Sequence, residues 1–364
     1  MNDSRQTLVI LTPAFPGDET ETVWVTPKQV FVRTLGNAFP ALDIVILSFQ
    51  YPKFRGEYDW EGHRVISFNG QGKGKFFRLL LWWKVWRRLN RLKKQTDILG
   101  LFSFWCGECA LVGKCWGKRN GIKHMTWISG QDALKGNHYA RLMRPAPSEL
   151  IAMSDFLSRN FLAHYGVRPA YTIPIGIDPD LFGKDPVEKD IDILGAGALI
   201  PLKQYDIFLQ VMSRLSADLH FLRGVLCGGG REETRMRTLI DRLHIQPHVV
   251  LKGETPHPEL LGLMRRCKVF LHPSSYEGFG AVCIEALFAG AHVISFCRPM
   301  DAWIPRWHVV NTVDEMYEKA LELLREAPPP EQQVMPYRME DSVHAVMDLF
   351  GIPGTLKRPA DGLA

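Results

Sequence analysis

The sequence predicts an α/β protein built from two doubly wound domains with parallel sheets. Along both halves of the chain, short apolar segments bounded by turn residues alternate with amphipathic segments. The apolar segments are typical of buried parallel strands, and the segments between them are typical of helices that cover both faces of a sheet. The length of 364 residues also fits two domains, each of about 150 residues or somewhat more.

The two halves show the same alternation of expected strands and helices. In the first half, strands are expected at residues 7–12, 44–48, 65–68, 97–102 and 124–129, with helices at 28–38 and 109–120 among them. In the second half, strands are expected at residues 191–194, 222–227, 248–252, 269–272 and 292–296. The expected helices of that half are residues 205–215, 232–243, 258–266, 284–289 and 313–325.

A charged, proline-containing segment at residues 183–189 marks the crossing between the domains. We expect an N-terminal domain of residues 1–172, completed by a C-terminal helix at about residues 336–352, and a second domain of residues 173–335. In doubly wound sheets, ligands bind at the carboxyl ends of the strands. The two domains are therefore expected to face a central cleft.

Composition excludes several classes of protein. The chain is 46% hydrophobic and 23% charged, which is typical of globular proteins and not of disordered or collagen-like chains. The longest apolar run, residues 79–83, is far shorter than the roughly 20 residues of a membrane-spanning helix. Residues 1–6 are polar, unlike a signal peptide, and the seven cysteines form no regular framework. We therefore expect a cytoplasmic protein with reduced thiols.

Positive charge is concentrated in one segment. Residues 70–95 contain nine Lys or Arg residues and no acid, so removing them changes the formal net charge from +5 to −4. The segment predicts a helix over residues 73–94 with an apolar face and a basic face. The apolar face contains Trp82, Val85, Trp86, Leu89 and Leu92, and the basic face contains Lys84, Arg87, Arg88, Arg91 and Lys94.

A basic amphipathic helix with tryptophan on its apolar side is typical of helices that lie in a membrane interface. Trp82, Trp86, Lys84, Arg87, Arg88 and Arg91 are therefore candidates for contact with an anionic membrane surface. An alternative is that the apolar face packs on the sheet of the first domain while the basic face meets solvent. A nucleic-acid site would explain the charge, but nothing else in the sequence supports it.

The stretch of residues 272–290 predicts a phosphate site. A strand ends at His272, a turn containing Gly278 and Gly280 follows, and a helix begins. The glycines allow backbone N–H groups to approach a ligand, and the helix N-terminus supplies free donors and positive potential. Glu277 and Glu285 flank the turn and could both accept hydrogen bonds from sugar hydroxyls.

Together with this stretch, several segments resemble retaining glycosyltransferases of the GT-B fold, specifically glycosyltransferase family 4 (group 1). The resemblance covers roughly residues 97–350 and is most specific in the second domain. Its further segments there are residues 173–182, 195–203, 227–230 and 249–253, while residues 129–132 and 151–154 match first-domain landmarks more loosely.

The resemblance implies a function and a set of site residues. It implies transfer of a sugar, with retained configuration, from a UDP- or GDP-sugar to an acceptor such as a lipid-linked or polysaccharide precursor, at the inner face of the membrane. No metal or other cofactor is implied, because a lysine and a helix terminus stabilise the charge that develops on the diphosphate. The implied catalytic residues are Glu277 and Lys203, and the implied donor-binding residues are Lys203, Gly197, Gly278, Phe279, Gly280 and Glu285.

The sequence departs from the family pattern at three places. Ala198 replaces an arginine that usually contacts the diphosphate, and Arg298 is a candidate to supply that charge instead. Ser129 replaces a histidine of the first domain, so the acceptor-side candidates are Ser129, Asp132 and Gly17. These departures leave two alternatives: a catalytically silent nucleotide-sugar-binding or scaffold protein, and a nucleotide-sugar epimerase on the same fold.

Overall fold

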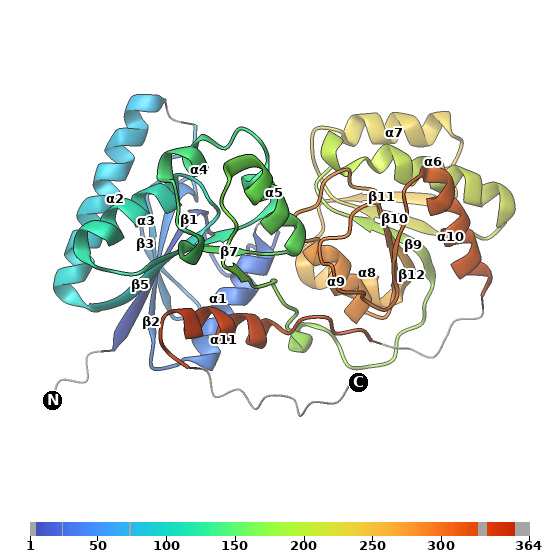
Figure 1. Cartoon of the computed structure of the whole chain (residues 1–364). Coiled ribbons are helices and arrows are strands. Elements are labelled where there is room, and N and C mark those ends of the chain that lie inside the picture. Colours follow the sequence, from blue (N-terminus) through green and yellow to red (C-terminus); the bar gives the residue numbers. More distant parts are fainter. Residues whose placement is uncertain (1–4, 24, 73, 327–332, 354–364) are drawn as a thin grey trace. The chain divides into compact units, whose positions relative to one another are not determined.

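A computed structural model describes residues 5–23, 25–72, 74–326 and 333–353 of the chain (Figure 1). The chain divides into two compact units. The first unit contains residues 1–176 and returns at residues 337–364, and the second contains residues 177–336. The sequence-based boundaries at residues 172 and 335 thus lie within a few residues of the change of unit.

The first unit contains an eight-stranded sheet with the strand order β3-β4-β2-β1-β5-β6-β7-β8. All paired neighbours are parallel except β3 and β4, which form an antiparallel edge. The strands are β1 Gln6–Ala14, β2 Asp43–Tyr51, β3 Gly56–Trp60, β4 His63–Ser67, β5 Asp97–Phe104, β6 His124–Ile128, β7 Leu150–Ala152 and β8 Tyr171–Thr172.

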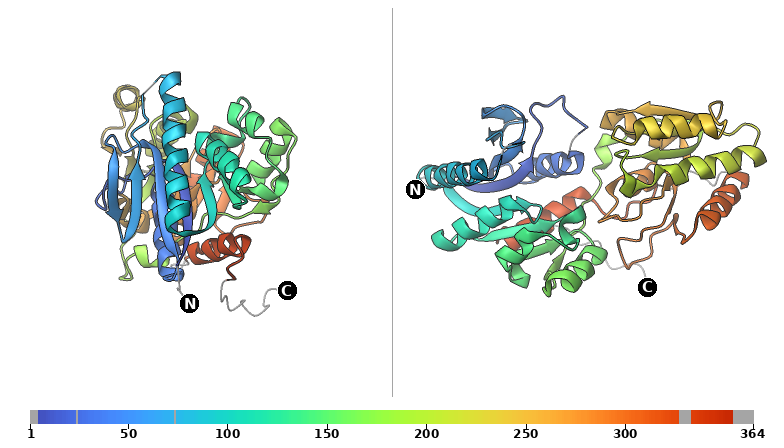
Figure 2. Two further views of the ribbon diagram at one scale, coloured as in Figure 1. Left: turned by 90° about the vertical axis from the view of Figure 1, so that its left-hand side faces the viewer. Right: turned by 90° about the horizontal axis from the view of Figure 1, so that it is seen from above.

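Helices pack against this sheet. The long helix α2 contacts β2, β5 and α3, and Figure 2 shows it running along the strands. The helix α11, which the chain contributes after leaving the second unit, packs against α1. The helices are α1 Thr26–Ala38, α2 Lys75–Gln95, α3 Glu108–Asn120, α4 His138–Met143, α5 Asp155–Tyr165 and α11 Met339–Leu349.

The second unit contains a six-stranded parallel sheet with the order β11-β10-β9-β12-β13-β14. A cluster of buried residues joins strands β9 and β12 to the helices α6, α7 and α10. The strands are β9 Ile191–Ala196, β10 Gly224–Cys227, β11 Val249–Gly253, β12 Cys267–His272, β13 His292–Ser295 and β14 Trp307–Val309. The helices are α6 Tyr205–Asp218, α7 Glu233–Arg242, α8 His257–Arg266, α9 Ala281–Phe288 and α10 Val313–Arg325.

The strand order of the second sheet identifies where a ligand would bind. Numbered within the unit, the order is 3-2-1-4-5-6, which is the doubly wound order of dinucleotide-binding domains. The connections reverse direction between β9 and β12, which are hydrogen-bonded neighbours. Because loops diverge at this reversal, the space at the carboxyl ends of β9 and β12 is the expected ligand site.

The α/β prediction of two Rossmann-like parallel sheets is confirmed, and the predicted strand and helix segments all form. Sequence reasoning missed the edge strands β3, β8 and β14 and the neighbouring strand β7. Strand β3 is polar, β14 contains a tryptophan and a histidine, and β7 and β8 are only three and two residues long. Within the described part of the chain, no helix has both the length and the apolar character needed to cross a bilayer.

Candidate functional site

The lysine of the candidate site follows the first strand at the reversal point. Strand β9 ends at Ala196, and a loop leads into a short 3-10 turn, Pro201–Lys203, directly before α6. Gln204 adopts a left-handed conformation between the turn and the helix, with φ of 49°. The turn therefore places Lys203 at the carboxyl end of β9, where the strand order predicts a ligand.

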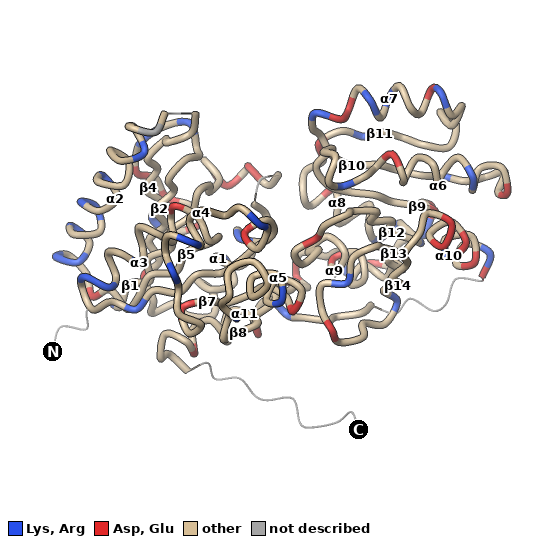
Figure 3. Tube along the Cα trace, turned by 45° about the horizontal axis from the view of Figure 1, so that its top comes forward, with Lys and Arg blue, Asp and Glu red and all other residues tan. Residues whose placement is uncertain are grey.

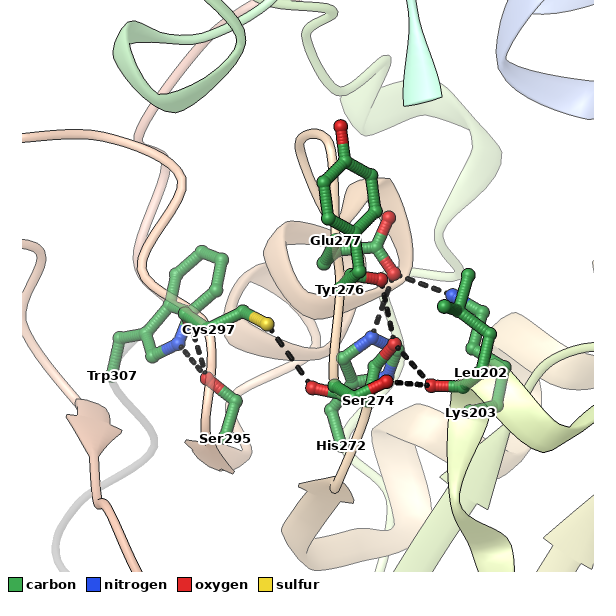
Figure 4. A network of polar contacts seen from close by, with 10 residues as sticks. Leu202, Lys203, His272, Ser274, Tyr276, Glu277, Ser295, Cys297 and Trp307 are labelled. Carbon is green, nitrogen blue, oxygen red and sulfur yellow. Dashed lines mark hydrogen bonds and ion pairs between the residues drawn. The ribbon is translucent and has the colours of Figure 1, made fainter. Parts of the chain in front are cut away.

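Glu277 reaches the same place from the loop after β12. Its Oε2 atom lies 2.5 Å from the Nζ atom of Lys203 and 2.9 Å from Nε2 of His272, the last residue of β12 (Figure 4). A carboxylate only accepts hydrogen bonds, so Nε2 of His272 holds the donated proton. The Lys203 and Glu277 side chains are mostly buried and His272 is fully buried. Lys203, Glu277 and His272 thus form a compact charged cluster at the reversal point.

The surroundings of Glu277 keep its carboxylate ionised. Burial raises the pKa of Glu277, but the hydrogen bond from His272 and the charge of Lys203 together outweigh burial and bring the pKa to about 2. For His272, burial lowers the pKa, so the imidazole is neutral near pH 7. The cluster therefore contains one cation, one anion and a neutral hydrogen-bond donor.

The two loops that carry the cluster are joined by main-chain hydrogen bonds. The carbonyl oxygen of Leu202 accepts from the backbone N–H of Ser275 at 3.0 Å and from its hydroxyl at 3.0 Å. The Ser274 hydroxyl lies 3.2 Å from the same oxygen (Figure 4). Because Leu202 precedes Lys203 and Ser275 lies two residues before Glu277, these bonds fix the spacing of the two charged side chains.

The predicted glycine turn leads into α9. Gly280 is the residue before the helix and has φ of 75°, a conformation that favours glycine. Phe279 is only 3% exposed, so its side chain belongs to the core, and its predicted contact with the donor stays a prediction. The backbone of residues 278–280, with the helix N-terminus behind it, stays a predicted phosphate-binding element.

Gly197 is required by close packing of neighbouring loops. It has φ of 151°, and a Cβ atom there would lie 2.7 Å from the hydroxyl oxygen of Tyr205. Its N–H donates to the carbonyl of Cys227 at 3.0 Å, and the N–H of Gly228 donates to Gly253 at 2.7 Å. These bonds join the loops after β9, β10 and β11. The structure thus gives Gly197 a packing role, and its predicted donor contact stays a prediction.

The second predicted carboxylate has a different partner. Glu285 lies in α9, and its Oε1 atom is 2.9 Å from Nε2 of His257, the first residue of α8. Both side chains are mostly buried. Glu277 and Glu285 belong to the same unit on either side of the glycine turn, but each is held by its own histidine.

Arg298 is held by its own loop. Its Nε atom donates to the carbonyl of Met300 at 3.1 Å, and Nη2 donates to the carbonyl of Asp301 at 2.7 Å. It lines a cavity of about 340 Å³ together with Trp303 and Trp307. No contact between Arg298 and the charged cluster is found among the described residues, so its predicted replacement of the arginine absent at residue 198 stays a prediction.

The acceptor-side candidates lie in the first unit, where Asp132 is a capping residue. Its Oδ2 atom accepts from the backbone N–H groups of Ser129 and Cys106, each at 2.9 Å. Burial raises the pKa of Asp132 to about 7. Lys28 is buried nearby, with Nζ 3.6 Å from the ring centroid of Trp127.

Gly17, another acceptor-side candidate, follows β1 and donates its N–H to Glu21 at 2.8 Å.

The structure gives Trp82 and Trp86 a packing role, and their predicted contact with a membrane stays a prediction. Both side chains pack against the hydrophobic core of the first unit, and the indole N–H of Trp82 donates to buried Glu108 at 3.1 Å. Arg88 is only 11% exposed and pairs with Glu57 at 2.6 Å. The alternative of a helix packed on the sheet is correct for this face. Lys73, where the expected helix starts, lies outside the described residues.

Sequence reasoning missed the two histidines of the site. His272 is the final residue of the strand before the glycine turn, and the alternation of side chains along a strand could have placed it near the ligand edge. His257 had no comparable signal, because its contact with α9 depends on how α8 packs. Among the described residues, no group of three or more His, Cys, Asp or Glu side chains is arranged to hold a metal ion.

Comparison with known proteins identifies relatives that match part of this chain. Residues 178–303 match the family model described as glycosyl transferases group 1. The gpi3 subunit of phosphatidylinositol N-acetylglucosaminyltransferase from Schizosaccharomyces pombe is 25% identical over 203 residues, which are 54% of this chain and 44% of that protein. The 2-deoxystreptamine N-acetyl-D-glucosaminyltransferase of Niallia circulans is 28% identical over 43% of this chain and 38% of its own length. The matches thus span about half the length of these relatives or less.

Solved structures share the fold over nearly the whole chain. A glycosyltransferase from Rickettsia africae superposes with a TM-score of 0.67 at 15% identity, covering 95% of this chain and 94% of that one. Anabaena Alr3699/HepE, solved in complex with UDP and glucose, superposes with a TM-score of 0.65 at 16% identity over 94% of both chains. At this level of identity the likeness establishes the fold, and it agrees with the predicted GT-B class.

Proposed function

Because residues 178–303 match the family model of glycosyl transferases group 1, we propose that the protein transfers a sugar from a nucleotide-diphosphate sugar to an acceptor with retained configuration. The observation that carries this proposal is the contact between Lys203 and Glu277 at the reversal point of the second sheet. A cation, a carboxylate and a helix N-terminus meet there, and these are the groups that a negatively charged diphosphate joined to a sugar requires.

The donor diphosphate binds at Lys203 and at the backbone of residues 278–280. Binding exchanges the contact of Lys203 with Glu277 for contact with phosphate oxygens, and Glu277 is then free to accept hydrogen bonds from the donor sugar. His272 keeps its hydrogen bond to Glu277 and orients the carboxylate. Glu285, oriented by His257, accepts from the ribose hydroxyls.

Charge stabilisation is the chemical contribution of Lys203 and the helix. When the bond between the sugar and the diphosphate breaks, its electron pair leaves on the phosphate oxygen, where the ammonium group and the backbone N–H donors stabilise it. The acceptor hydroxyl forms the new bond to the same sugar carbon, on the face from which the diphosphate leaves, and its proton passes to the leaving phosphate oxygen. Removing one oriented donor from such a site typically costs a factor of about 100 or more in turnover. No metal ion is needed in this scheme.

The proposed donors are UDP- or GDP-hexoses and the proposed acceptors are lipid-linked or polysaccharide precursors. UDP in the Anabaena neighbour and phosphatidylinositol in the name of the yeast relative support these classes. Incubation of the protein with UDP- and GDP-sugars, with and without a membrane extract, should release nucleoside diphosphate faster when the extract is present. NMR of the product should show the anomeric configuration of the donor.

Two variants test the site. Glu277→Gln and Lys203→Met should each lower turnover by about 100-fold or more. The matched controls are Glu259→Gln and Lys252→Met, which alter a more exposed ion pair of 2.8 Å in the same unit. Full turnover by Glu277→Gln would contradict the proposal. Binding of a nucleotide sugar with no release under any condition would support the silent binding protein instead.

A further inference from the structure

The exposed face of α2 carries an apolar stripe that the core does not use. Phe76 is 89% exposed, Leu79 is 60% exposed, and Leu80 and Trp83 are each 53% exposed. Their spacing of three and four residues places them on one side of the helix. Leu81, Val85, Leu89 and Leu92, which are fully buried, occupy the opposite side. The helix thus has two apolar faces, and only one of them is covered by the protein.

Basic residues continue the exposed stripe toward the end of the helix. Arg87 lies four residues after Trp83, and its guanidinium carbon is 4.7 Å from the centroid of that tryptophan ring. Arg91 follows after one more turn and is exposed. The Lys and Arg positions along α2 are visible as blue segments in Figure 3. The apolar residues and the cations therefore form one continuous surface of the first unit.

A cavity of about 480 Å³ lies beside this surface, between α2 and the edge strands β3 and β4. Its lining includes Arg55, Lys84, Arg87 and Arg91, and within the described ranges no carboxylate forms an ion pair with any of these four. The lining also includes Glu57, but that carboxylate is held by Arg88 at 2.6 Å and by Arg64 at 3.1 Å. The cavity thus has an excess of positive charge and fits an anionic group.

We propose that this surface docks on an anionic phospholipid bilayer, with Phe76, Leu79, Leu80 and Trp83 inserted among the lipids and a headgroup phosphate bound in the Arg- and Lys-lined cavity. Apolar side chains followed by cations match the order of a membrane interface, where acyl chains give way to charged headgroups. The proposed contact is made by residues other than Trp82 and Trp86, which the core retains.

The combination of features favours a bilayer over other anionic partners. A nucleic acid or a free phosphate would account for the cations, but neither would account for four large apolar side chains exposed beside them. Each basic residue near an anionic leaflet strengthens binding by roughly fivefold. The four cavity cations and the inserted side chains together are therefore sufficient for reversible docking without any spanning helix.

Flotation of the full-length protein with vesicles tests the proposal. One vesicle population contains phosphatidylcholine alone, and in the other about one lipid in three is phosphatidylglycerol. We expect flotation with the anionic vesicles and little with the neutral ones. Arg87→Gln with Arg91→Gln should weaken the partition coefficient by about 30-fold. The control, Lys118→Gln with Arg119→Gln, removes two exposed charges from the end of α3 and should leave binding near that of the parent.

Apolar insertion has its own variants. Phe76→Ser with Leu80→Ser should also reduce flotation, whereas Phe221→Ser removes a 98% exposed phenylalanine of the second unit and should not. Circular dichroism of each variant, and the rise in its melting temperature on addition of nucleotide, check that both units remain folded. Failure of the parent to float with either vesicle overturns the proposal, as does equal loss in the α3 control. Saturation of the cavity by inorganic phosphate without vesicle binding, or binding of a DNA duplex in place of vesicles, would assign the surface to those ligands and overturn it too.

Discussion

Replacing Glu277 by glutamine should lower the free energy of unfolding below that of the parent. This loss of stability should be larger near neutral pH than in acid. The contacts with His272 and Lys203 bring the pKa of Glu277 from 4.5 to about 2 in spite of burial. A downward shift of this size corresponds to stabilisation of the folded state on the order of 3 kcal/mol at neutral pH. Glutamine carries no charge, so the variant lacks this contribution.

The sign of the pH dependence follows from the direction of the shift. A carboxyl group whose folded pKa is lowered stabilises the fold fully above its unfolded pKa of 4.5, and the stabilisation disappears as the pH falls toward the folded value of about 2. Between about pH 6 and about pH 3, the difference in unfolding free energy between parent and variant should shrink by about 2 kcal/mol.

Urea-induced unfolding at several pH values measures this difference. Glu259→Gln is the matched control, because Glu259 is half exposed and pairs with Lys252 at the surface. Its stability difference from the parent should be small and nearly independent of pH, as surface ion pairs contribute little. A parent–variant difference at Glu277 that stays constant over the acid range would refute the reasoning, since it would mean that the carboxylate is not held by its partners.

Three further substitutions, one of them with a matched control, test individual contacts. Gly197→Ala should lower the melting temperature, because the new Cβ atom would lie 2.7 Å from a tyrosine hydroxyl. Gly262→Ala should instead raise stability by about 1 kcal/mol, because Gly262 lies within α8 and a Cβ atom there meets open space. A higher melting temperature for Gly197→Ala than for Gly262→Ala would contradict this prediction. Trp82→Phe should destabilise the first unit by about 1 kcal/mol through loss of the bond to Glu108, which urea unfolding measures. His257→Ala should weaken nucleotide binding, measured by calorimetry, and its effect on stability should be smaller. An unchanged affinity would mean that Glu285, the partner of His257, does not bind the ribose.

The sequence predicted the architecture well because hydrophobic alternation determines it. Strands β9 and β12 are short, mostly apolar runs, and a glycine follows the first directly while a histidine ends the second. The pairing of Lys203 with Glu277 could also have been anticipated, because a doubly wound order places the first and fourth strands side by side. The glycine turn at Gly280 was identified from the sequence, and the structure explains the glycine by its positive φ, while the predicted approach of a ligand stays a prediction.

Which face of α2 packs on the sheet could not be predicted from amphipathicity alone. The segment contains apolar residues on two opposite sides, and sequence reasoning favoured membrane contact for the longer stripe, with packing on the sheet as the alternative. Burial of Val85 and Leu89 shows that this stripe packs on the sheet, which leaves the shorter one, beginning at Phe76, exposed. A tryptophan satisfies either setting, since its ring packs in a core and its N–H needs only one acceptor, as Trp82 demonstrates.

The hydrogen bonds to the Leu202 carbonyl affect which amino-acid substitutions the site can tolerate during evolution. That oxygen belongs to the main chain, so no substitution at residue 202 deletes it, and only proline at residue 275 would remove the partner N–H. The alignment of the two loops therefore tolerates drift in most of the side chains around it. Substitutions can therefore accumulate in the neighbouring segments and alter which ligands bind there, while the Lys203 ammonium and the Glu277 carboxylate keep their relative positions.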